Sequence, residues 1–595
     1  MSAVGLDRVG GRLPTLPALD GIRAVAIAGV LLYHSDIFWF PGGLLGVEVF
    51  FVLSGYLITS ILWNELLAEG RVSIPVFLKR RARRLFPALF VMLAVACAVW
   101  VIWYPQEVAR VRGDVAAAAT YTSNWYMIHA DHSYFAQFAR PSPFGHLWSL
   151  AIEEQFYLLW PPILFGLFAW LRRPGKVARV ALTGAGASVI ALSFLYHAGG
   201  DASRIYFGTD TRAAGLLIGS ALAIVWRPYA FSSWSERHSD KPWLLDAGTA
   251  FSTAIIVWAF MRFEDTSPWT YRPGLLVVSL ATASLIASAV HPNARLGRVL
   301  GIRPLRWLGK RSYSVYIWYF PVFALTRPGV DNQLSIGTAF AMRVAITITL
   351  AELSYRYVEQ PIRNGALGRM LRRVREQSRA GAARRRTVLG LSAAGSIALI
   401  LASSLAVAMA AATPPHHEPS ASSGGHIGRP EDITPIDLGL GPDPHVVAVG
   451  DSVMVGARPQ LRERFGTIRV DAKVARQVSE GINRLKLMRR RGQLGDVVII
   501  HLGNNGKFTS AQFDEIMRIV SGVKRVLFVN VKVPRRWEAS VNRVLVAGVH
   551  RYPGVVYVNW RHQWRYCNGR IFGSDATHLT PAGARCYARV IAGAI

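Results

Sequence analysis

The chain has 595 residues, of which 52% are hydrophobic, and its mean hydropathy is +0.27. This composition is too apolar for an ordinary soluble protein of this length, so it predicts a membrane protein. The formal net charge of +31 would suit a nucleic-acid-binding protein. The basic residues, however, gather in short segments between apolar runs, which is the positive-inside pattern of membrane proteins, and we expect no nucleic-acid partner.

Hydrophobic runs recur through the first 412 residues, and a membrane-spanning helix needs roughly 20 apolar residues. We therefore predict about eleven spans in the lipid bilayer. They lie at residues 22–40, 46–63, 85–104, 146–171, 179–197, 211–226, 243–261, 273–290, 312–327, 336–356 and 388–412. If the amino terminus is cytoplasmic, every basic segment lies on the cytoplasmic side, and the carboxyl-terminal region lies outside the cytoplasm. The first run ends without a small-residue cleavage site, so we expect no cleavable signal peptide.

The carboxyl-terminal quarter of the chain has a different pattern. Residues 413–444 are rich in Pro, Ser, Gly and His and predict a flexible linker in preference to a metal-binding histidine tract, so we expect no metal site. Beyond it, short β-branched runs alternate with polar, helix-like segments. This alternation predicts an α/β domain with a parallel sheet and helices on both faces. The predicted strands are residues 445–450, 468–473, 496–502, 525–531 and 555–560.

Four polar residues of this domain form a pattern typical of nucleophilic acyl transfer. Ser452 follows the first predicted strand in Gly-Asp-Ser, at the edge of a parallel sheet where active sites lie. Asn505 follows the third predicted strand, and it and the N–H of Ser452 would stabilise an oxyanion. His578 would accept the proton of Ser452, and Asp575 would orient the imidazole. Gly-Asp-Ser alone predicts only a turn, but the other three residues favour the catalytic interpretation.

These motifs resemble those of the SGNH hydrolase family, and the resemblance covers residues 445–595. It implies the roles just given to the serine, asparagine, aspartate and histidine. Two departures stand out. Ala475 occupies the place where the family often has a glycine as another oxyanion donor, and Gly506 replaces the family's Asp after the Asn. A backbone N–H survives the first change, so catalysis is not excluded.

The two cysteines of this domain, Cys567 and Cys586, flank the motif that holds Asp575 and His578. An exported domain lies in an oxidising compartment, which favours pairing, so we predict a disulfide between them. Two reduced thiols are the alternative. Cys97, in the third predicted span, has no obvious partner.

Polar and ionisable residues interrupt several predicted spans, where they are costly and are therefore functional candidates. Arg23 and His34 lie about three turns apart on the first predicted helix, near one face. The other candidates are Glu153, Glu154, Asp210, Arg212, Ser312, Tyr313, Glu352, Ser354 and Glu359. Each also has a structural explanation: Arg23 could reach the cytoplasmic interface, and the two adjacent glutamates could pair with arginines only to fix the bundle.

The order of motifs across residues 15–365 resembles the acyltransferase type 3 family of membrane acyltransferases. The matching pieces are Leu19-Asp20-Gly21-Ile22-Arg23-Ala24, His34, residues 46–56, Arg80 with Arg83, Trp148-Ser149-Leu150, residues 153–157, Asp210-Thr211-Arg212 and Ser312-Tyr313. One departure is Tyr319, at a position where the family commonly has a histidine. The resemblance implies a bacterial inner (plasma) membrane enzyme that moves an acyl group onto carbohydrate outside the membrane. Fusion to an exported SGNH domain is a recurring arrangement in this family.

The resemblance also implies a relay across the membrane. The donor would be acyl-CoA, acetyl-CoA in particular, with no bound cofactor. Arg80 and Arg83 would meet its phosphates, although topology-setting charge explains them nearly as well. His34 would act as general base or polarise the thioester, with its pKa tuned by Arg23 and the Glu153–Glu154 pair. Ser452 would then carry the acyl group as an ester before delivery to an envelope polysaccharide or glycolipid.

We therefore expect four parts in the chain. They are an acyltransferase type 3 membrane domain at residues 1–365, a basic cytoplasmic segment with the final span at 366–412, the linker at 413–444 and an extracytoplasmic SGNH-like domain at 445–595. Two other functions compete. A membrane-tethered carbohydrate O-acetyl esterase needs only one anchoring span, so intramembrane charge would be superfluous in it. A transporter or flippase commonly shows related halves, and the sequence has no such symmetry.

Overall fold

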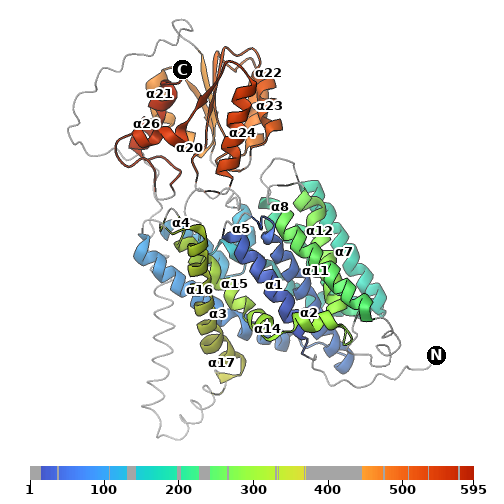
Figure 1. Ribbon diagram of the computed structural model, residues 1–595. Coiled ribbons are helices and arrows are strands. Elements are labelled where there is room, and N and C mark those ends of the chain that lie inside the picture. Colours follow the sequence, from blue (N-terminus) through green and yellow to red (C-terminus); the bar gives the residue numbers. More distant parts are fainter. Residues whose placement is uncertain are drawn as a thin grey trace, which may run out of the picture.

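The structure is a computed structural model of the chain, which places a group of packed helices before a separate α/β unit (Figure 1). It describes residues 15–369 and 445–595 with short gaps. The gaps are residues 36–38, 106–107, 130–141, 197–202, 227–241, 264–266, 268, 329–330, 333, 367–368, 474–475, 507, 534, 536 and 574–575. The predicted linker and the predicted last span, 388–412, therefore lie outside the described residues, as does most of the predicted basic segment.

The first part of the chain is helical in its described residues. Its α-helices are α1 (Pro17–His34), α2 (Gly46–Glu69), α3 (Ile74–Trp103), α4 (Val108–Ala119), α5 (Ser123–His129), α6 (Trp148–Leu171), α7 (Pro174–Leu195), α8 (Ser203–Phe207), α9 (Thr209–Val225), α11 (Pro242–Arg262), α12 (Leu275–Ala289), α13 (Arg295–Leu300), α14 (Arg303–Lys310), α15 (Ser312–Leu325), α16 (Ile336–Ser354) and α17 (Gln360–Arg363). Local signals set some boundaries. Gly70 ends α2 with a left-handed φ of 68°, which glycine adopts without a steric penalty. A proline stands in the first turn of α3, where its missing N–H costs nothing.

Five helical segments of the described part are long and apolar enough to cross a membrane. They are Gly43–Glu69, Ile74–Trp103, Pro174–Leu195, Pro242–Arg262 and Thr270–Ala289. Five further predicted spans coincide with α1, α6, α9, α15 and α16, but α9 has 17 residues and α15 has 14. The pair Glu153–Glu154 lies in α6. The described part is thus that of a multi-pass membrane protein, while the predicted count of about eleven stays a prediction.

Close packing of α2 on α9 organises the centre of the helical part. A Cβ atom on Gly55 of α2 would lie 1.9 Å from the Leu216 carbonyl oxygen, and one on Gly219 of α9 would lie 2.1 Å from the Val52 carbonyl oxygen. Only glycine fits at both places, which lets the two backbones approach as small residues do in membrane helices. This approach brings the arginine near the start of α9 against the acidic residue in the first turn of α2.

The α/β unit contains the predicted parallel sheet. Its strands are β1 (Val446–Gly450), β2 (Arg469–Ala472), β3 (Val497–His501), β4 (Arg525–Val529) and β5 (Val555–Val558), each lying within a predicted strand. They pair in the order β2-β1-β3-β4-β5, all parallel. The helices are α20 (Ser452–Gly456), α21 (Arg458–Phe465), α22 (Val478–Arg490), α23 (Ser510–Ile519), α24 (Glu538–Arg551), α25 (Trp560–Gln563) and α26 (Pro581–Ala592).

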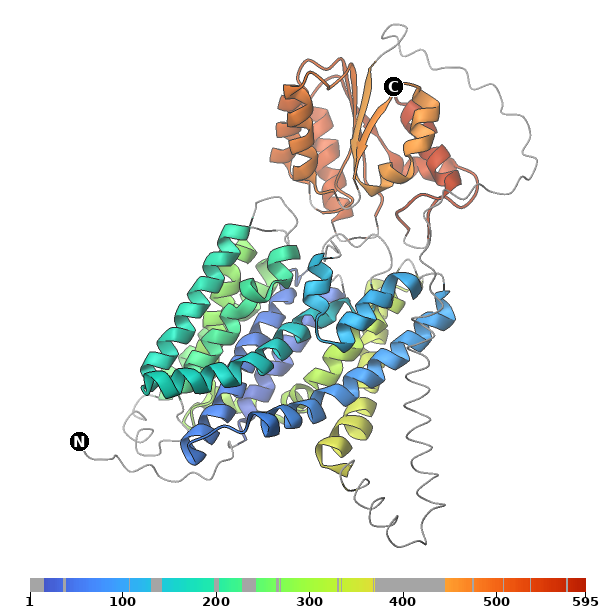
Figure 2. The ribbon, with the colours of Figure 1, turned by 180° about the vertical axis from the view of Figure 1, so that it is seen from behind.

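Alternating strand residues supply two cores, one on each face of the sheet. Val447, Val449 and Ile500 pack with α22, α23 and α24, whereas Val446 and Ala448 pack with α20, α21 and α26. Figures 1 and 2 show these two sets of helices on opposite sides of the strands. Because both faces are covered, the central strands β1 and β3 are almost continuously apolar, which is the pattern expected of a buried parallel sheet.

A disulfide ties the last helix to the segment before it. Cys567 and Cys586 are bonded, with their Cα atoms 6.1 Å apart. Cys586 lies on α26, so the bond closes a loop that contains the short antiparallel bridge between Phe572 and Leu579. Cys97 is buried in α3 as a free thiol.

Candidate functional site

A polar pocket lies among α1, α2, α3, α6 and α15. Three arginines line it, and they are Arg23 of α1 and Arg81 and Arg84 of α3. Arg80 and Arg83, which the sequence analysis assigned to the donor phosphates, are exposed and are not among the lining residues. The structure therefore places the neighbouring pair, one residue later along the helix, at the pocket.

Hydrogen-bonding side chains line the same pocket. Glu153 accepts hydrogen bonds from Ser54 Oγ at 2.9 Å and from Tyr157 OH at 3.2 Å, so the carboxylate is held on two sides. Tyr313 lines the pocket and donates to the Leu85 carbonyl oxygen at 2.6 Å. Two other candidates lie nearby: Ser312 is a lining residue, and Glu154 interacts electrostatically with Arg81. A pocket with three guanidinium groups and few carboxylates suits an anionic ligand.

His34 lies apart from this pocket, at the other end of α1 from Arg23, about 16 Å away by helical rise. The centroid of its ring lies 5.2 Å from that of Tyr319 and 5.4 Å from that of Phe320. Its Nδ1 lies 3.0 Å from the Val30 carbonyl oxygen. Arg23 lines the pocket and His34 does not. The expected tuning of His34 by Arg23 and the two glutamates therefore stays a prediction. Arg23 and His34 lie near one face of α1, but residues on one helical face can lie far apart along the helix axis.

A second histidine, which the sequence analysis did not select, lies beside the first. His146 is 1% exposed and stacks on Phe320 at 5.1 Å. It interacts electrostatically with His34. Tyr316 lies between the histidines and the pocket, because its OH donates to the His146 carbonyl oxygen at 2.9 Å and lies 2.5 Å from Ser149 Oγ, a pocket-lining atom. The Tyr316 hydroxyl therefore connects pocket-lining Ser149 to the backbone of His146, and the Tyr316 and His146 ring centroids lie 5.4 Å apart.

The candidates Asp210 and Arg212 have separate partners. Arg212 is 2% exposed and pairs with Glu48 at 3.0 Å, and Glu48 also accepts a 2.6 Å hydrogen bond from Ser279. Asp210 pairs with Arg204 at 2.9 Å near the surface. A buried pair that is broken leaves an uncompensated charge, so the Arg212–Glu48 pair is best explained as a device that fixes α9 on α2.

In the α/β unit, Ser452 lies at the point where the strand order reverses. The order β2-β1-β3-β4-β5 has its switch point between β1 and β3, and ligands of such sheets bind beyond the carboxyl ends of those two strands. Ser452 directly follows β1 as the first residue of α20, and Asp451 caps that helix by accepting from the Val453 N–H at 3.2 Å. The Ser452 hydroxyl is buried and has no hydrogen-bond partner among the described residues.

Asn505 lies just beyond β3, on the other side of the switch point. Its side-chain Nδ2 donates to the Arg476 backbone carbonyl oxygen at 3.1 Å. Its backbone carbonyl oxygen accepts a hydrogen bond from Gln477 Nε2 at 3.0 Å. One Nδ2 hydrogen remains for a ligand, as an oxyanion donor requires. Ala475, the position expected to offer a further N–H, lies outside the described residues.

The loop that carries His578 is held from two directions. The His578 carbonyl oxygen accepts from the Gly573 N–H at 2.8 Å, and Lys532, just beyond β4, donates to the Ala576 carbonyl oxygen at 3.2 Å. His578 is half-buried and interacts electrostatically with Asp451, the neighbour of Ser452. Asp575, the predicted partner of His578, lies outside the described residues.

A buried hydrogen-bond chain lies behind the nucleophile. Asn504 Nδ2 lies 3.0 Å from Asp451 Oδ2 and 3.2 Å from His501 Nε2, and His501 Nδ1 lies 2.6 Å from the Tyr587 hydroxyl. Burial raises the pKa of Asp451 to about 6, although hydrogen bonds from Asn504 and Val453 and the charge of His578 lower it. Burial lowers the pKa of His501 to about 3. The imidazole is therefore neutral, with Nε2 accepting from Asn504 and Nδ1–H donating to Tyr587.

Comparisons with known proteins cover both parts of the chain. A family model described as an acyltransferase domain matches residues 16–352. The chain belongs to the acyltransferase type 3 family. It is 35% identical to a putative peptidoglycan O-acetyltransferase, YrhL, of Bacillus subtilis, over 97% of this chain and 98% of that one. It is 33% identical to the peptidoglycan O-acetyltransferase OatA of Listeria monocytogenes, over 97% of each chain.

A solved structure is also similar to this acyltransferase type 3 protein. It is the C-terminal catalytic domain of Streptococcus pneumoniae peptidoglycan O-acetyltransferase A with a methylsulfonyl adduct. The match has 19% identity and a TM-score of 0.24 and covers 25% of this chain and 91% of that one. The family match and the full-length relatives make this chain an O-acetyltransferase, as the sequence predicts.

The burial of residues along α3 distinguishes the pocket arginines from their neighbours. Phe77 and Leu85 are buried, eight residues apart, so one face of α3 points into the protein. With 3.6 residues per turn, that face includes positions 81 and 84 and excludes 80 and 83. His146 had no such signal, because it lies in a short 3₁₀ helix, Gly145–Leu147, just before α6.

Proposed function

We propose that this enzyme transfers acetyl groups from a cytoplasmic acyl-CoA, acetyl-CoA in particular, to peptidoglycan on the outer side of the bacterial plasma membrane. The observation that carries the proposal is the full-length match to relatives named peptidoglycan O-acetyltransferases. Because that match spans both the helical part and the α/β unit, it favours one activity that uses both, and it disfavours the tethered esterase, which needs only an anchor.

In this proposal the arginine pocket receives the donor. The phosphates of coenzyme A carry several negative charges, and Arg23, Arg81 and Arg84 line one cavity. The amino terminus is proposed to be cytoplasmic, which puts the Arg23 end of α1 toward the cytoplasm and the His34 end toward the outside. His34, with His146 beside it, is proposed as the general base that accepts the proton of a carrier's nucleophile as it attacks the thioester carbonyl carbon, and the coenzyme A thiol takes that proton as it leaves.

On the outer side, Ser452 is the proposed nucleophile of residues 445–595. Ser452 Oγ attacks the acetyl carbonyl carbon and its proton passes to His578, which then donates that proton to the carrier of the acetyl group as the carrier leaves. Asn505 Nδ2 and the Ser452 N–H stabilise the oxyanion, and Asp575 orients His578. A sugar hydroxyl then attacks the acetyl-serine ester, His578 accepts the hydroxyl proton, and the proton returns to Ser452 as the O-acetyl sugar leaves.

The test measures acetyl esters on purified peptidoglycan by mass spectrometry, in cells that carry only the variant gene. Ser452→Ala should reduce acetylation at least about a hundredfold, because the variant lacks the attacking oxygen. Arg84→Ala should also reduce it strongly, whereas Arg83→Ala, an exposed neighbour on the same helix, should not. Full acetylation in a well-expressed Ser452→Ala strain would reject the serine mechanism.

The donor is tested separately in membrane vesicles. Acetyl-CoA labelled in its acetyl group should transfer label to peptidoglycan added on the outer side, and Arg84→Ala vesicles should not transfer it. Transfer from another acetyl donor but not from acetyl-CoA would change the donor and leave the acceptor and Ser452 in place.

A further inference from the structure

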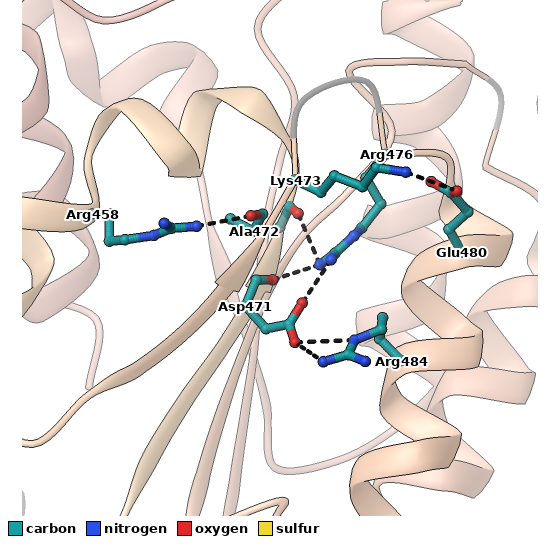
Figure 3. Close-up of polar contacts among 8 residues, drawn as sticks. Arg458, Asp471, Ala472, Lys473, Arg476, Glu480 and Arg484 are labelled. Atoms are coloured by element: carbon teal, nitrogen blue, oxygen red, sulfur yellow. Dashed lines mark hydrogen bonds and ion pairs between the residues drawn. The ribbon is translucent and has the colours of Figure 1, made fainter. Parts of the chain in front are cut away.

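Arg476 is a buried residue that joins the ends of two strands beside Ser452. It lies between β2 and α22 and is 4% exposed. Its Nη1 donates to the Gly450 carbonyl oxygen at 3.2 Å. Figure 3 shows its two bonds to Asp471, from Nη1 to the carbonyl oxygen at 2.5 Å and from Nη2 to Oδ1 at 2.6 Å. Gly450 is the last residue of β1, two residues before Ser452.

The backbone of the same residue determines how Asn505 is oriented. Asn505 Nδ2 donates to the Arg476 carbonyl oxygen, and Asn505 Oδ1 has no hydrogen-bond partner among the described residues. The amide orientation therefore depends on that carbonyl group, together with the packing around it. Gln477 adds a contact to the Asn505 backbone, so two consecutive residues of this segment hold the proposed oxyanion donor.

We propose that Arg476 is a positioning residue of the Ser452 site, which fixes the proposed oxyanion donor Asn505 relative to the nucleophile. The inference rests on the proposed function, since it assumes the roles given there to Ser452 and Asn505. Through its guanidinium group Arg476 holds the carboxyl ends of β1 and β2, and through its carbonyl oxygen it holds Asn505. Three separate segments of the site thus meet at one residue.

The chemistry of arginine explains why this residue type is needed. A planar guanidinium group offers several N–H donors in a fixed fork, so it bonds two carbonyl oxygens and a carboxylate at once. A lysine at this position keeps the charge opposite Asp471 but cannot make all these bonds in fixed directions. Arg476→Lys should therefore preserve the ion pair and loosen the segment that orients Asn505.

Arg484 is a matched control because it shares the same carboxylate. It donates to Asp471 Oδ2 from Nε at 3.0 Å and from Nη2, and its side chain is 39% exposed (Figure 3). Its hydrogen bonds in the described part of the chain go to Asp471, and none goes to Gly450 or Asn505. A role in the ion pair alone predicts similar losses for Arg476→Lys and Arg484→Lys, whereas a role in positioning predicts a loss for Arg476→Lys only.

The experiment uses the full chain in detergent, with p-nitrophenyl acetate as acyl donor and methylsulfonyl fluoride as a probe of Ser452. Arg476→Lys should lower kcat about 10-fold to 100-fold with KM within about twofold, because a misplaced oxyanion donor weakens transition-state binding and not substrate binding. Sulfonylation of Ser452, followed by peptide mass, should slow in parallel. Arg484→Lys should remain within about twofold of wild type in both assays.

A double variant shows whether Arg476 acts through Asn505. Asn505→Ala should lower kcat about 100-fold or more. If Arg476 acts by orienting Asn505, Arg476→Lys should cause little further loss in the Asn505→Ala protein. Fully additive losses, or equal losses in Arg476→Lys and Arg484→Lys, would overturn the inference.

Two measurements keep these outcomes interpretable. Thermal unfolding identifies an Arg476→Lys protein that has lost its fold, and in that case Gln477→Ala replaces it, since this variant removes a contact to Asn505 without touching the ion pair. Gln477→Ala at wild-type kcat would then contradict the inference. Failure of methylsulfonyl fluoride to label Ser452 in the wild type would instead count against the proposed function itself.

Discussion

At the scale of single residues, the site depends on buried polar groups whose protonation is set by their surroundings. Asp451 and His501 are both fully buried, and both bond the same amide, that of Asn504. Because ionised Asp451 can only accept and the amide nitrogen can only donate, the chain of hydrogen bonds has one consistent direction when His501 is neutral. That direction holds the loop after β3 against the nucleophile turn.

The pKa shifts of these two groups predict opposite pH effects on stability. His501 has a pKa of about 3 in the folded domain and an ordinary value of 6.5, so the unfolded chain binds a proton that the folded domain does not, and stability is lost as pH falls below 6.5. Asp451 has a pKa of about 6 and an ordinary value of 3.8, so the folded domain holds the extra proton and stability is lost as pH rises from about 4 to 6.

Urea unfolding of residues 440–595 at pH 6.5 and pH 4.5 checks this prediction. When the pH falls from 6.5 to 4.5, the free energy of unfolding of His501→Gln should rise by about 2 kcal/mol relative to wild type, because the variant no longer takes up a proton at this position on unfolding. Asp451→Asn should change by about 2 kcal/mol in the opposite direction. If neither variant alters the pH dependence, the two groups do not titrate as their burial indicates.

At the scale of elements, the strands were far easier to predict than the membrane helices. Short β-branched runs between polar segments predicted all five strands of the sheet, because the central strands, which are covered on both faces, are apolar along most of their length. The helices α9 and α15 coincide with predicted spans but are short, and the rings of α15 are surrounded by protein. A helix inside a bundle need not match the thickness of the bilayer by itself, so hydropathy alone does not define it.

The sequence pattern also predicted only part of the candidate site. Ser452 and Asn505 were predictable because each follows a strand, and the ends of neighbouring parallel strands meet at one edge. Arg476 was not selected, because its importance comes from three partners that the sequence separates by 5 to 29 residues. In the membrane part, the choice between Arg80 and Arg81 required the helical phase of α3, which two buried residues, Phe77 and Leu85, reveal.

The disulfide between Cys567 and Cys586 yields a prediction at this scale. The two cysteines are 19 residues apart, and the bond closes a loop that carries His578. The double variant Cys567→Ser/Cys586→Ser should lower the free energy of unfolding by about 3 kcal/mol, because a loop of this size gains conformational freedom in the unfolded chain. Urea unfolding of residues 440–595 measures this loss. Peptide mass mapping of the non-reduced protein should find the linked pair, and two free thiols would contradict the prediction.

At the scale of the whole molecule, two chemically distinct sites occur in one chain. The arginine pocket and the paired histidines lie in the helical part, whereas the serine site lies in the α/β unit, after residues 413–444. A nucleophilic serine suffices for ester chemistry on soluble substrates. Buried cations, imidazoles and carboxylates in the membrane part are costly, and an anchor needs none of them. Their presence is best explained if the membrane part supplies the acyl group that the serine transfers.

This explanation predicts an asymmetric effect of His34. If the membrane part is only an anchor, His34→Ala leaves peptidoglycan acetylation intact apart from a modest loss of stability. If it delivers acetyl groups, His34→Ala should lower acetylation in cells at least about tenfold, since general-base catalysis commonly contributes more than that. The purified His34→Ala protein should still hydrolyse p-nitrophenyl acetate at the wild-type rate, because that substrate reaches Ser452 directly. A blot for protein level and membrane insertion excludes misfolding, and normal acetylation by a well-inserted His34→Ala protein would reject the relay.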